Sequence, residues 1–371
     1  MVAIFEKHDL RDFDWPTALL ATLIAAFGVW QIHNALPSEN YWTKQIIGIV
    51  IALAAFLVVS FMDYRRLIDL APVFYVIGLV MLLMVLTPLG VTINGQKAWV
   101  RIAGIQFQPS EFCKIPTALM LAKFFGAKKG GTLSIREMLI GGAIFAGPIL
   151  LILLEPDAGQ AITYFPILAA MYFLSGIKMR YVVLAVVAAA VLVPAAWIVG
   201  VKTGKIKTYQ QERINAIIDP SSVDPRGFGY HTIQSTITVG KGGLSGNQGD
   251  TETSQSVLKF LPEPQTDFIF AVTAENTGFI GCVSLLLAYA LLLSRMIAGA
   301  RQSSERSGML LIMSIVCGLV FQIFMNVGMA LGILPVIGVP LPLMSAGLSA
   351  ILSTFIAIGF VVSVKLRRFV N

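Results

Sequence analysis

The chain is 371 residues long, and 56% of its residues are hydrophobic while only 13% are charged. A soluble domain carries roughly a quarter charged residues because its surface faces water, so the composition excludes an ordinary soluble domain. The net charge of +7 comes from residues grouped between long apolar runs. This distribution indicates orientation in a membrane and argues against nucleic acid as a partner.

Apolar runs long enough to cross a hydrocarbon core of roughly 30 Å recur along the chain. We predict one all-α integral membrane domain over residues 1–371, with about ten transmembrane helices. Residues 1–16 are polar and are expected to form a cytoplasmic N-terminus. The predicted spans are residues 17–36, 44–62, 68–88, 110–126, 137–154, 160–176, 180–200, 266–294, 308–332 and 345–364.

Lysine and arginine in the connections predict the orientation, because they are enriched in cytoplasmic loops. With the N-terminus inside, the short outer loops contain only Lys44, Lys97 and Arg101, and most of the remaining basic residues fall in inner connections. Both termini are therefore expected in the cytoplasm. Residues 201–265 form the longest polar segment and are predicted to be a large extracytoplasmic loop between helices 7 and 8.

Ionisable side chains at membrane depth are rare, and they mark either a functional site or a structural ion pair. Glu111 and Lys114 follow Ser110 and stand three residues apart, so they can share one face of a helix start. The pair either orients a short helix or takes part in substrate binding.

Two further acidic positions fall at the predicted outer face. Glu155 and Asp157 flank Pro156 in a turn that is expected to expose both carboxylates, either as a turn cap or as functional groups. Thr266 and Asp267 open the eighth span, and each of them is a candidate N-cap. A partly desolvated carboxylate at this boundary can instead accept a proton from a hydroxyl nucleophile.

An anionic leaving group such as pyrophosphate would need cations nearby. The candidates are Lys97, Arg101, Lys114, Arg213 and Lys241, and a solvated loop charge is the alternative for each. Residues 240–246 are rich in glycine but have neither Walker nor Rossmann spacing, so ATP or dinucleotide binding is not expected. The three cysteines and three histidines are scattered, and no metal site is expected.

A set of motifs occurs in order along the chain. The most specific segment runs from Leu261-Pro262-Glu263 through Thr266-Asp267-Phe268-Ile269-Phe270 to Glu275 and Gly278. Together these motifs resemble the SEDS family of peptidoglycan polymerases, specifically its RodA branch, with the FtsW branch as the near neighbour. Supporting matches are Gly95 with Trp99, Gln108-Pro109-Ser110-Glu111 with Lys114, Pro156-Asp157 with Gly159, Tyr209-Gln210 with Arg213, Gly242-Gly243-Leu244, Asn326, Gly328 and Pro340-Leu341-Pro342.

The resemblance implies polymerisation of lipid II into glycan strands for cell elongation and rod shape, on the outer face of the bacterial cytoplasmic (inner) membrane. The family's essential aspartate matches Asp267, which would deprotonate the 4-hydroxyl of the acceptor GlcNAc. Attack on the anomeric carbon would then release undecaprenyl pyrophosphate with inversion. The positions expected to bind substrate or support the site are Glu111, Lys114, Asp157, Lys97, Trp99, Arg101, Arg213, Glu263, Thr266 and Glu275.

The resemblance also implies partners. The family acts with a class B penicillin-binding protein, the transpeptidase that cross-links the strands, within the elongation machinery. No cofactor is demanded, although a divalent cation (Mg²⁺ or Mn²⁺) on the pyrophosphate is chemically reasonable. The chain departs from the family pattern where Ala98 precedes Trp99 in place of a basic residue, and where Asn276 follows Glu275 in place of a second acid.

Two other classes of protein compete with a glycosyltransferase. A flippase for a lipid-linked precursor would favour polar groups at several membrane depths and inverted repeats with broken helices. The sequence has no convincing internal repeat, and its acids gather at one predicted face. A non-catalytic scaffold for a transpeptidase would tolerate Asp267→Asn.

Overall fold

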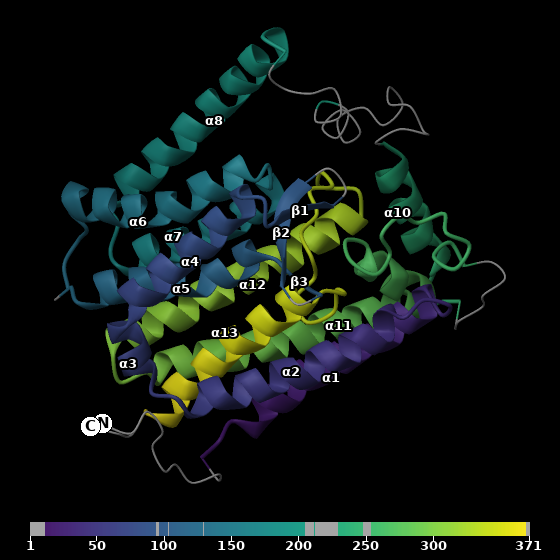
Figure 1. Cartoon of the computed structure of the whole chain (residues 1–371), viewed down its shortest axis with the longest axis horizontal. Helices are drawn as coiled ribbons and strands as arrows, with labels where there is room; N and C mark the ends of the chain where they lie inside the picture. Colours follow the sequence, from purple (N-terminus) through teal and green to yellow (C-terminus); the bar gives the residue numbers. More distant parts are fainter. Residues whose placement is uncertain are drawn as a thin grey trace.

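The computed structural model describes residues 12–93, 96–102, 104–128, 130–204, 211, 229–247 and 254–368. Its ten longest helices correspond one to one with the ten predicted spans (Figure 1). They are α1 (Trp15–Ala35), α2 (Tyr41–Phe61), α4 (Ala71–Leu86), α5 (Pro109–Gly126), α6 (Ile135–Leu154), α7 (Ala158–Leu174), α8 (Met179–Lys202), α11 (Ile269–Arg301), α12 (Arg306–Ala330) and α13 (Leu348–Leu366).

Within the described residues, seven of these helices are long and apolar enough to cross a membrane. Helices α4 and α7 are apolar but shorter, and α5 contains Glu111, Lys114 and Lys123. The mainly helical membrane fold is therefore confirmed. The count of ten crossings stays a prediction.

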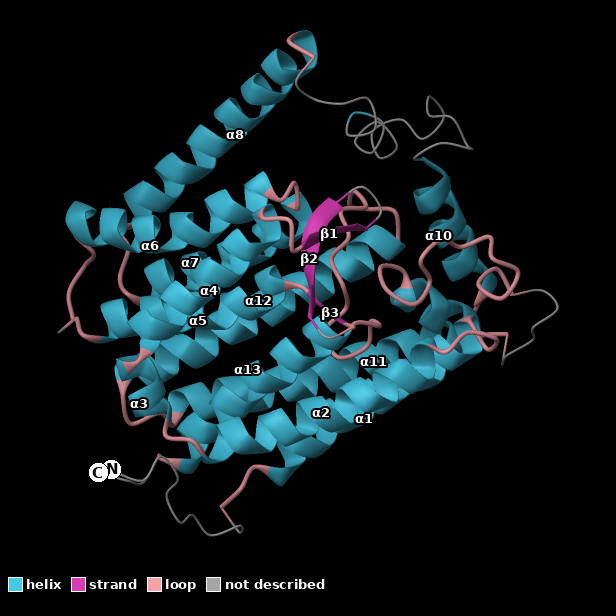
Figure 2. Ribbon diagram, in the orientation of Figure 1, coloured by secondary structure: helices cyan, strands magenta, loops and turns pink. Residues whose placement is uncertain are grey.

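One small antiparallel sheet, which was not predicted, precedes α5 (Figure 2). Its strands are β1 (Gly90–Ile93), β2 (Gln96–Ile102) and β3 (Ile105–Phe107), in the order β1-β2-β3. Ala98 and Val100 of β2 are buried, whereas Lys97 and Trp99 are half-buried and Arg101 is exposed. Trp99 and Arg101 are two residues apart and share one face of the strand, whereas the pairing with β1 shifts register at Ala98, between Lys97 and Trp99.

Two shorter helices lie outside the predicted spans. Helix α3 (Tyr64–Asp69) joins α2 to α4, and α10 (Gly229–Lys241) lies inside the segment predicted to be an extracytoplasmic loop. Helix α11 begins at Ile269, three residues after the predicted start, and continues to Arg301. Residues 261–268, here called the returning segment, precede α11 and are not helical.

The helices form two groups that meet at α12 and α13. Helices α1, α2 and α11 lie on one side and α4 to α7 on the other (Figure 1). Helix α13 packs most extensively against α2 and also contacts α5 and α11, while α12 contacts α5, α7 and α11. None of the residues of α8, all of which the structure describes, is buried, and this helix projects from the bundle (Figure 1).

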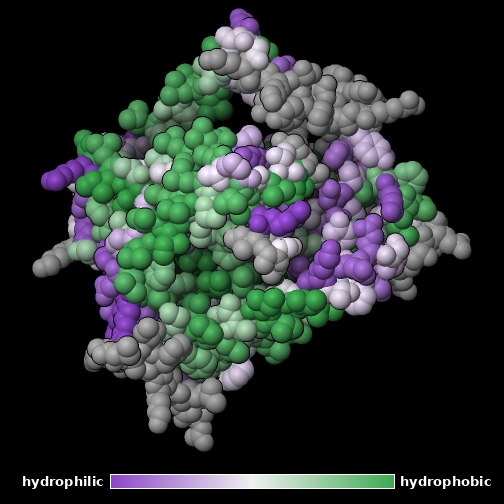
Figure 3. Space-filling model, viewed as in Figure 1, coloured by the Kyte–Doolittle hydropathy of each residue, from purple (hydrophilic) through white to green (hydrophobic). Residues whose placement is uncertain are grey.

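The surface is consistent with a membrane environment. Large apolar side chains such as Val50, Leu139 and Phe324 are more than half exposed, and apolar residues cover the middle of the molecule between two polar ends (Figure 3). At one end the basic residues pair across helices. Arg295 and Lys365 bind Asp14 at 2.5 and 2.6 Å, which joins the start of α1 to α11 and α13. The returning segment lies at the opposite end of the bundle, where it leads into α11.

Candidate active site

Asp267 lies in the returning segment, and it is half-buried. Three consecutive carbonyl groups, those of residues 265–267, accept hydrogen bonds from distant parts of the chain. The donors are the Ala346 amide at 2.7 Å, the Ser345 hydroxyl at 2.6 Å and the Asn326 side-chain amide at 2.9 Å. The backbone that carries Asp267 is therefore held by α12 and by the loop before α13.

Thr266 and Asp267 do not cap helix α11. Position N-cap of α11 belongs to Phe268, and no side-chain cap is present there among the described residues. The interpretation of Thr266 or Asp267 as an N-cap is therefore wrong. Thr266 is half-buried with its hydroxyl near the Glu263 carbonyl, and Glu263 is exposed and accepts a hydrogen bond from Gln265.

The Asp267 carboxylate faces a glycine-containing loop between α12 and α13. A Cβ atom placed on Gly338 would lie 3.6 Å from Asp267 Oδ2, and Gly338 has a positive φ of 75°. The preceding residue contacts α7, because a Cβ atom on Gly159 would lie only 2.1 Å from the Ile337 carbonyl oxygen. Glycine at position 159 therefore allows α7 to approach the loop that faces Asp267.

We predict that Gly159→Ala disturbs this approach. The new methyl group meets the backbone oxygen of Ile337, which must move and take the loop beside Asp267 with it. Overpacking of this kind typically costs about 1–3 kcal/mol, so the midpoint of thermal unfolding and the activity should both fall. Gly299→Ala in α11, whose Cβ would have its nearest neighbours at 3.8 Å, is the matched control and should lower neither the thermal midpoint nor the activity.

A buried polar network joins α5, α7 and α13. Glu111, which is 3% exposed, pairs with Lys114 at 3.0 Å. Its carboxylate also accepts hydrogen bonds from Gln160 at 2.7 Å and from Ser353 at 3.1 Å. The predicted ion pair is confirmed, and the carboxylate has three partners from three helices.

Asp157 belongs to the same network through Gln160. One carboxylate oxygen caps α7 by accepting from the Gln160 amide at 3.0 Å, and the other accepts from the Gln108 side chain at 3.0 Å. Burial raises the pKa of Asp157, and the negative charge of Glu111 acts in the same direction, while the hydrogen bonds oppose both. The predicted turn cap is confirmed, and the carboxylate is buried.

The prediction that the turn exposes both carboxylates is wrong. Glu155 is fully buried, and among the described residues neither of its carboxylate oxygens has a hydrogen-bond partner. Burial, together with the nearby Asp157, raises the pKa of Glu155 to about 8. Glu155 is therefore mostly protonated at neutral pH.

We predict that this proton makes stability depend on pH. The unfolded chain releases it near the ordinary glutamate pKa of 4.5, whereas the folded protein holds it up to about 8. The free energy of unfolding should thus fall as pH rises through this window, by up to about 1.4 kcal/mol per pH unit. Glu155→Gln carries no ionisable proton, so its thermal midpoint should fall less between about pH 6 and about pH 9. An equal fall in both proteins would contradict the assignment.

Glu275 serves as an anchor for part of the large loop. It is fully buried in α11 and accepts four hydrogen bonds from residues 254–256, the shortest being 2.6 Å. Just beyond it, Gly278 interrupts the helical backbone, and the amides of Phe279 and Ile280 bond to carbonyls of Gly243 and Leu244. Both contacts attach the loop to α11 beside the returning segment.

The predicted cations are distributed over several elements. Lys97 donates to the carbonyls of Leu86 and Thr87 at the end of α4, at 3.3 and 2.8 Å. Lys241 is exposed at the end of α10, and Arg213 lies outside the described residues. In the described part of the chain, no group of three or more His, Cys, Asp or Glu side chains could hold a metal ion.

Several residues of the site were not singled out as site residues from the sequence. Asn326 and Ser345 hold the returning segment, and Gln160 and Ser353 complete the partners of Glu111. The signal in the sequence that could have indicated them is a side-chain amide or hydroxyl in an otherwise apolar segment, since such a group needs a hydrogen-bond partner when it is buried. Their partners could not be read from the sequence because they lie far away along the chain.

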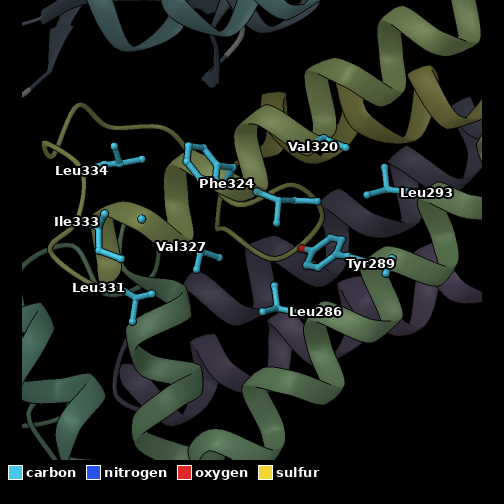
Figure 4. A pocket seen from close by; sticks show the side chains of 12 residues that line it. Leu286, Tyr289, Leu293, Val320, Phe324, Val327, Leu331, Ile333 and Leu334 are labelled. Atoms are coloured by element: carbon cyan, nitrogen blue, oxygen red, sulfur yellow. The ribbon is translucent and has the colours of Figure 1, made fainter.

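An apolar cavity of about 380 Å³ lies between α11 and α12. Leu331, Ile333 and Leu334 stand at one end of it, and Val320 and Leu293 at the other (Figure 4). The hydroxyl of Tyr289 donates to the Pro342 carbonyl. The cavity is therefore a place for apolar groups and is distinct from the acidic network.

Comparisons with known proteins agree on one family. The family model for FtsW/RodA/SpoVE cell cycle proteins matches residues 17–368. The peptidoglycan glycosyltransferase MrdB of Escherichia coli K12 is 35% identical over 355 residues, covering 95% of this chain and 94% of the relative. The stage V sporulation protein E of Bacillus subtilis is 30% identical over 349 residues, with 93% and 92% covered.

Solved structures show the same fold. The chain superposes with a TM-score of 0.82 on a chain from a peptidoglycan synthase complex described as coordinating polymerization and crosslinking, at 32% identity, covering 97% of this chain and 99% of the other. The rod shape-determining protein RodA of Thermus thermophilus gives a TM-score of 0.72 at 27% identity, covering 97% and 98%. The resemblance found in the sequence motifs is thus confirmed, and the chain belongs to the FtsW/RodA/SpoVE family.

Proposed function

We propose that the protein is a peptidoglycan glycosyltransferase that polymerises lipid II into glycan strands for cell elongation. The observation that carries the proposal is the half-buried Asp267, held in a non-helical segment by hydrogen bonds to three successive carbonyls. A carboxylate held in this way is pre-organised to meet a substrate hydroxyl. Relatives with the same family fold are named peptidoglycan glycosyltransferases.

In the proposed reaction, Asp267 accepts the proton of the acceptor GlcNAc 4-hydroxyl. The oxygen attacks the anomeric carbon of the growing chain as the bond to pyrophosphate breaks, which inverts the configuration and releases undecaprenyl pyrophosphate. Asp267 then gives the proton to solvent. The cations Lys97, Arg101, Lys114, Arg213 and Lys241 are the candidates to hold the pyrophosphate, and a divalent cation (Mg²⁺ or Mn²⁺) on the pyrophosphate would add positive charge there.

The buried network supports the site in this scheme. Glu111, Lys114 and Asp157 fix α5, α7 and α13 relative to one another. Ser349 at the start of α13 accepts from the Gln108 amide at 2.9 Å, and the loop before α13 donates to the returning segment. Charged groups in this network would thus support Asp267 from a distance, and Glu275 would hold the adjoining loop.

We further propose where the protein acts and with which partner. The ion pairs of Arg65, Lys128, Arg295, Lys365 and Arg367 lie at the end of the bundle opposite Asp267. The positive-inside rule assigns this end to the cytoplasm together with both termini. Asp267 would then work at the outer face of the bacterial cytoplasmic membrane. The related complex that joins polymerization to crosslinking supports a class B penicillin-binding protein as the partner, within the elongation machinery.

The decisive experiment supplies lipid II to the purified protein with its transpeptidase partner in lipid vesicles. Glycan strands of many disaccharide units are the expected product. A flippase would instead move lipid II across the bilayer without forming polymer, and a scaffold would do neither. Absence of polymer from an intact complex, with verified lipid II, would overturn the proposal.

A further inference from the structure

We propose that Asn326 is a positioning residue that sets the place of Asp267, an inference that rests on the proposed function. Asn326 lies in α12 and is fully buried. Its side-chain amide donates to the carbonyl of Asp267 and to the carbonyl of Val339, both at 2.9 Å. A primary amide has two N–H donors, so both are used.

The Asp267 carbonyl needs such a donor because it lies outside the helix. The carbonyl of Phe268, the N-cap residue, accepts the first helical hydrogen bond, from the Val272 amide. The carbonyl of Asp267, one residue earlier, is not part of this series of helical hydrogen bonds. A backbone carbonyl in a half-buried segment needs another partner, and Asn326 provides it. The orientation of the peptide group after Asp267 is therefore set by α12.

The second bond of Asn326 reaches the loop on the other side of the carboxylate. Val339 follows Gly338, the residue that faces Asp267 Oδ2. One side chain thus ties together the backbone that carries the carboxylate and the backbone that lies against it. The amide cannot turn around, since its oxygen would then face two carbonyl oxygens. Asn326 therefore fixes the width of this site as well as the place of Asp267.

Asn276 is a matched comparison in the same protein. It is also buried, and its amide donates to Gln31 at 2.8 Å, so it joins α11 to α1. This hydrogen bond links two side chains and leaves the returning segment untouched. Losing it should lower stability in the way that losing any buried hydrogen bond does, with no specific effect on Asp267.

The test compares four variants in the full complex: Asn326→Ala and Asn326→Leu, with Asn276→Ala and Asn276→Leu as controls. Alanine leaves a cavity, whereas leucine keeps the branched shape of the asparagine side chain at a larger volume, and both remove the donors. Two readouts are taken, the steady-state kinetics of lipid II polymerisation and the hydrogen–deuterium exchange of peptides covering residues 262–270. The second readout needs no activity.

Both Asn326 variants should lower kcat by about tenfold to 10²-fold, the usual effect of a misplaced catalytic group, with KM changed less than about threefold. Exchange in residues 262–270 should become faster. The Asn276 variants should leave kcat and that exchange within about twofold of wild type.

Three results would overturn the inference. The first is a normal kcat in a folded Asn326 variant, and the second is an effect confined to KM. The third is a defect in Asn326→Ala that Asn326→Leu lacks, because the cavity would then be the cause. If the wild type forms no polymer, the proposed function fails, and unchanged exchange in the Asn326 variants would still refute the role of Asn326.

Discussion

Replacing Asp267 with asparagine is expected to abolish glycan-strand formation in a protein that remains folded and bound to its partner. The substitution preserves size but removes the acceptor for the hydroxyl proton. General-base catalysis typically contributes 10² to 10⁴-fold to a rate, so polymer should fall by about that factor or below detection. The fold should tolerate the change because backbone carbonyls accept the hydrogen bonds that hold this segment in place. Product length and amount on gels measure the result.

A matched control for this experiment is Glu39→Gln. Glu39 is also an acidic residue at the end of the bundle where the returning segment lies. Its only described ion pair is with the exposed Lys259 at 3.5 Å. An exposed pair of this kind contributes little to stability, so the control should polymerise lipid II like the wild type. Equal polymer from Asp267→Asn and wild type would remove Asp267 from the mechanism and favour another base.

Replacing Lys114 with methionine is expected to destabilise the protein strongly. The change leaves Glu111 buried with only the hydrogen bonds from Gln160 and Ser353. Removing one partner of a buried ion pair typically costs about 3–5 kcal/mol because the other charge stays without compensation. The midpoint of thermal unfolding in detergent should fall accordingly, and polymerisation should fall with it, since α5, α7 and α13 meet at this carboxylate.

The double variant Glu111→Gln/Lys114→Met separates charge from shape. It removes both charges and keeps the volumes, and replacing a whole buried pair in this way is often neutral for stability. The thermal midpoint should therefore recover toward that of the wild type. If activity stays low in the recovered double variant, the charges serve the substrate directly. A single Lys114→Met variant as stable as the wild type would contradict the burial of an isolated charge.

Much of the helical architecture could be predicted because it depends on local chemistry. A segment in a hydrocarbon core must satisfy its backbone within itself, so long apolar runs become helices wherever they occur. The predicted span at 137–154 became α6 (Ile135–Leu154), and the predicted span at 345–364 became α13 (Leu348–Leu366). Boundaries differed most at α11, where the returning segment stays outside the helix and the far end extends to Arg301.

Features that depend on neighbours distant in sequence were missed. The sheet before α5 was not predicted, because its strands are short and contain Gly and Lys between apolar residues. The burial of Glu155 was also missed, because Pro156 and Gly159 indicate a turn but not what covers it. Gly159 likewise gives no sign of the loop that packs against it, because Ile337 lies more than 170 residues later in the chain.

The sequence by itself determined the membrane environment, the helices, the Glu111–Lys114 pair and the position of Asp267 close to the beginning of α11, because composition, periodicity and spacing along the chain are local properties. Tertiary structure alone decided which groups meet. Gln160 and Ser353 join Glu111 across 49 and 242 residues, and Asn326 reaches Asp267 across 59. The physical reason is that a buried polar group must find a partner in space, and only the packing of α12 and α13 against the other helices brings those partners together.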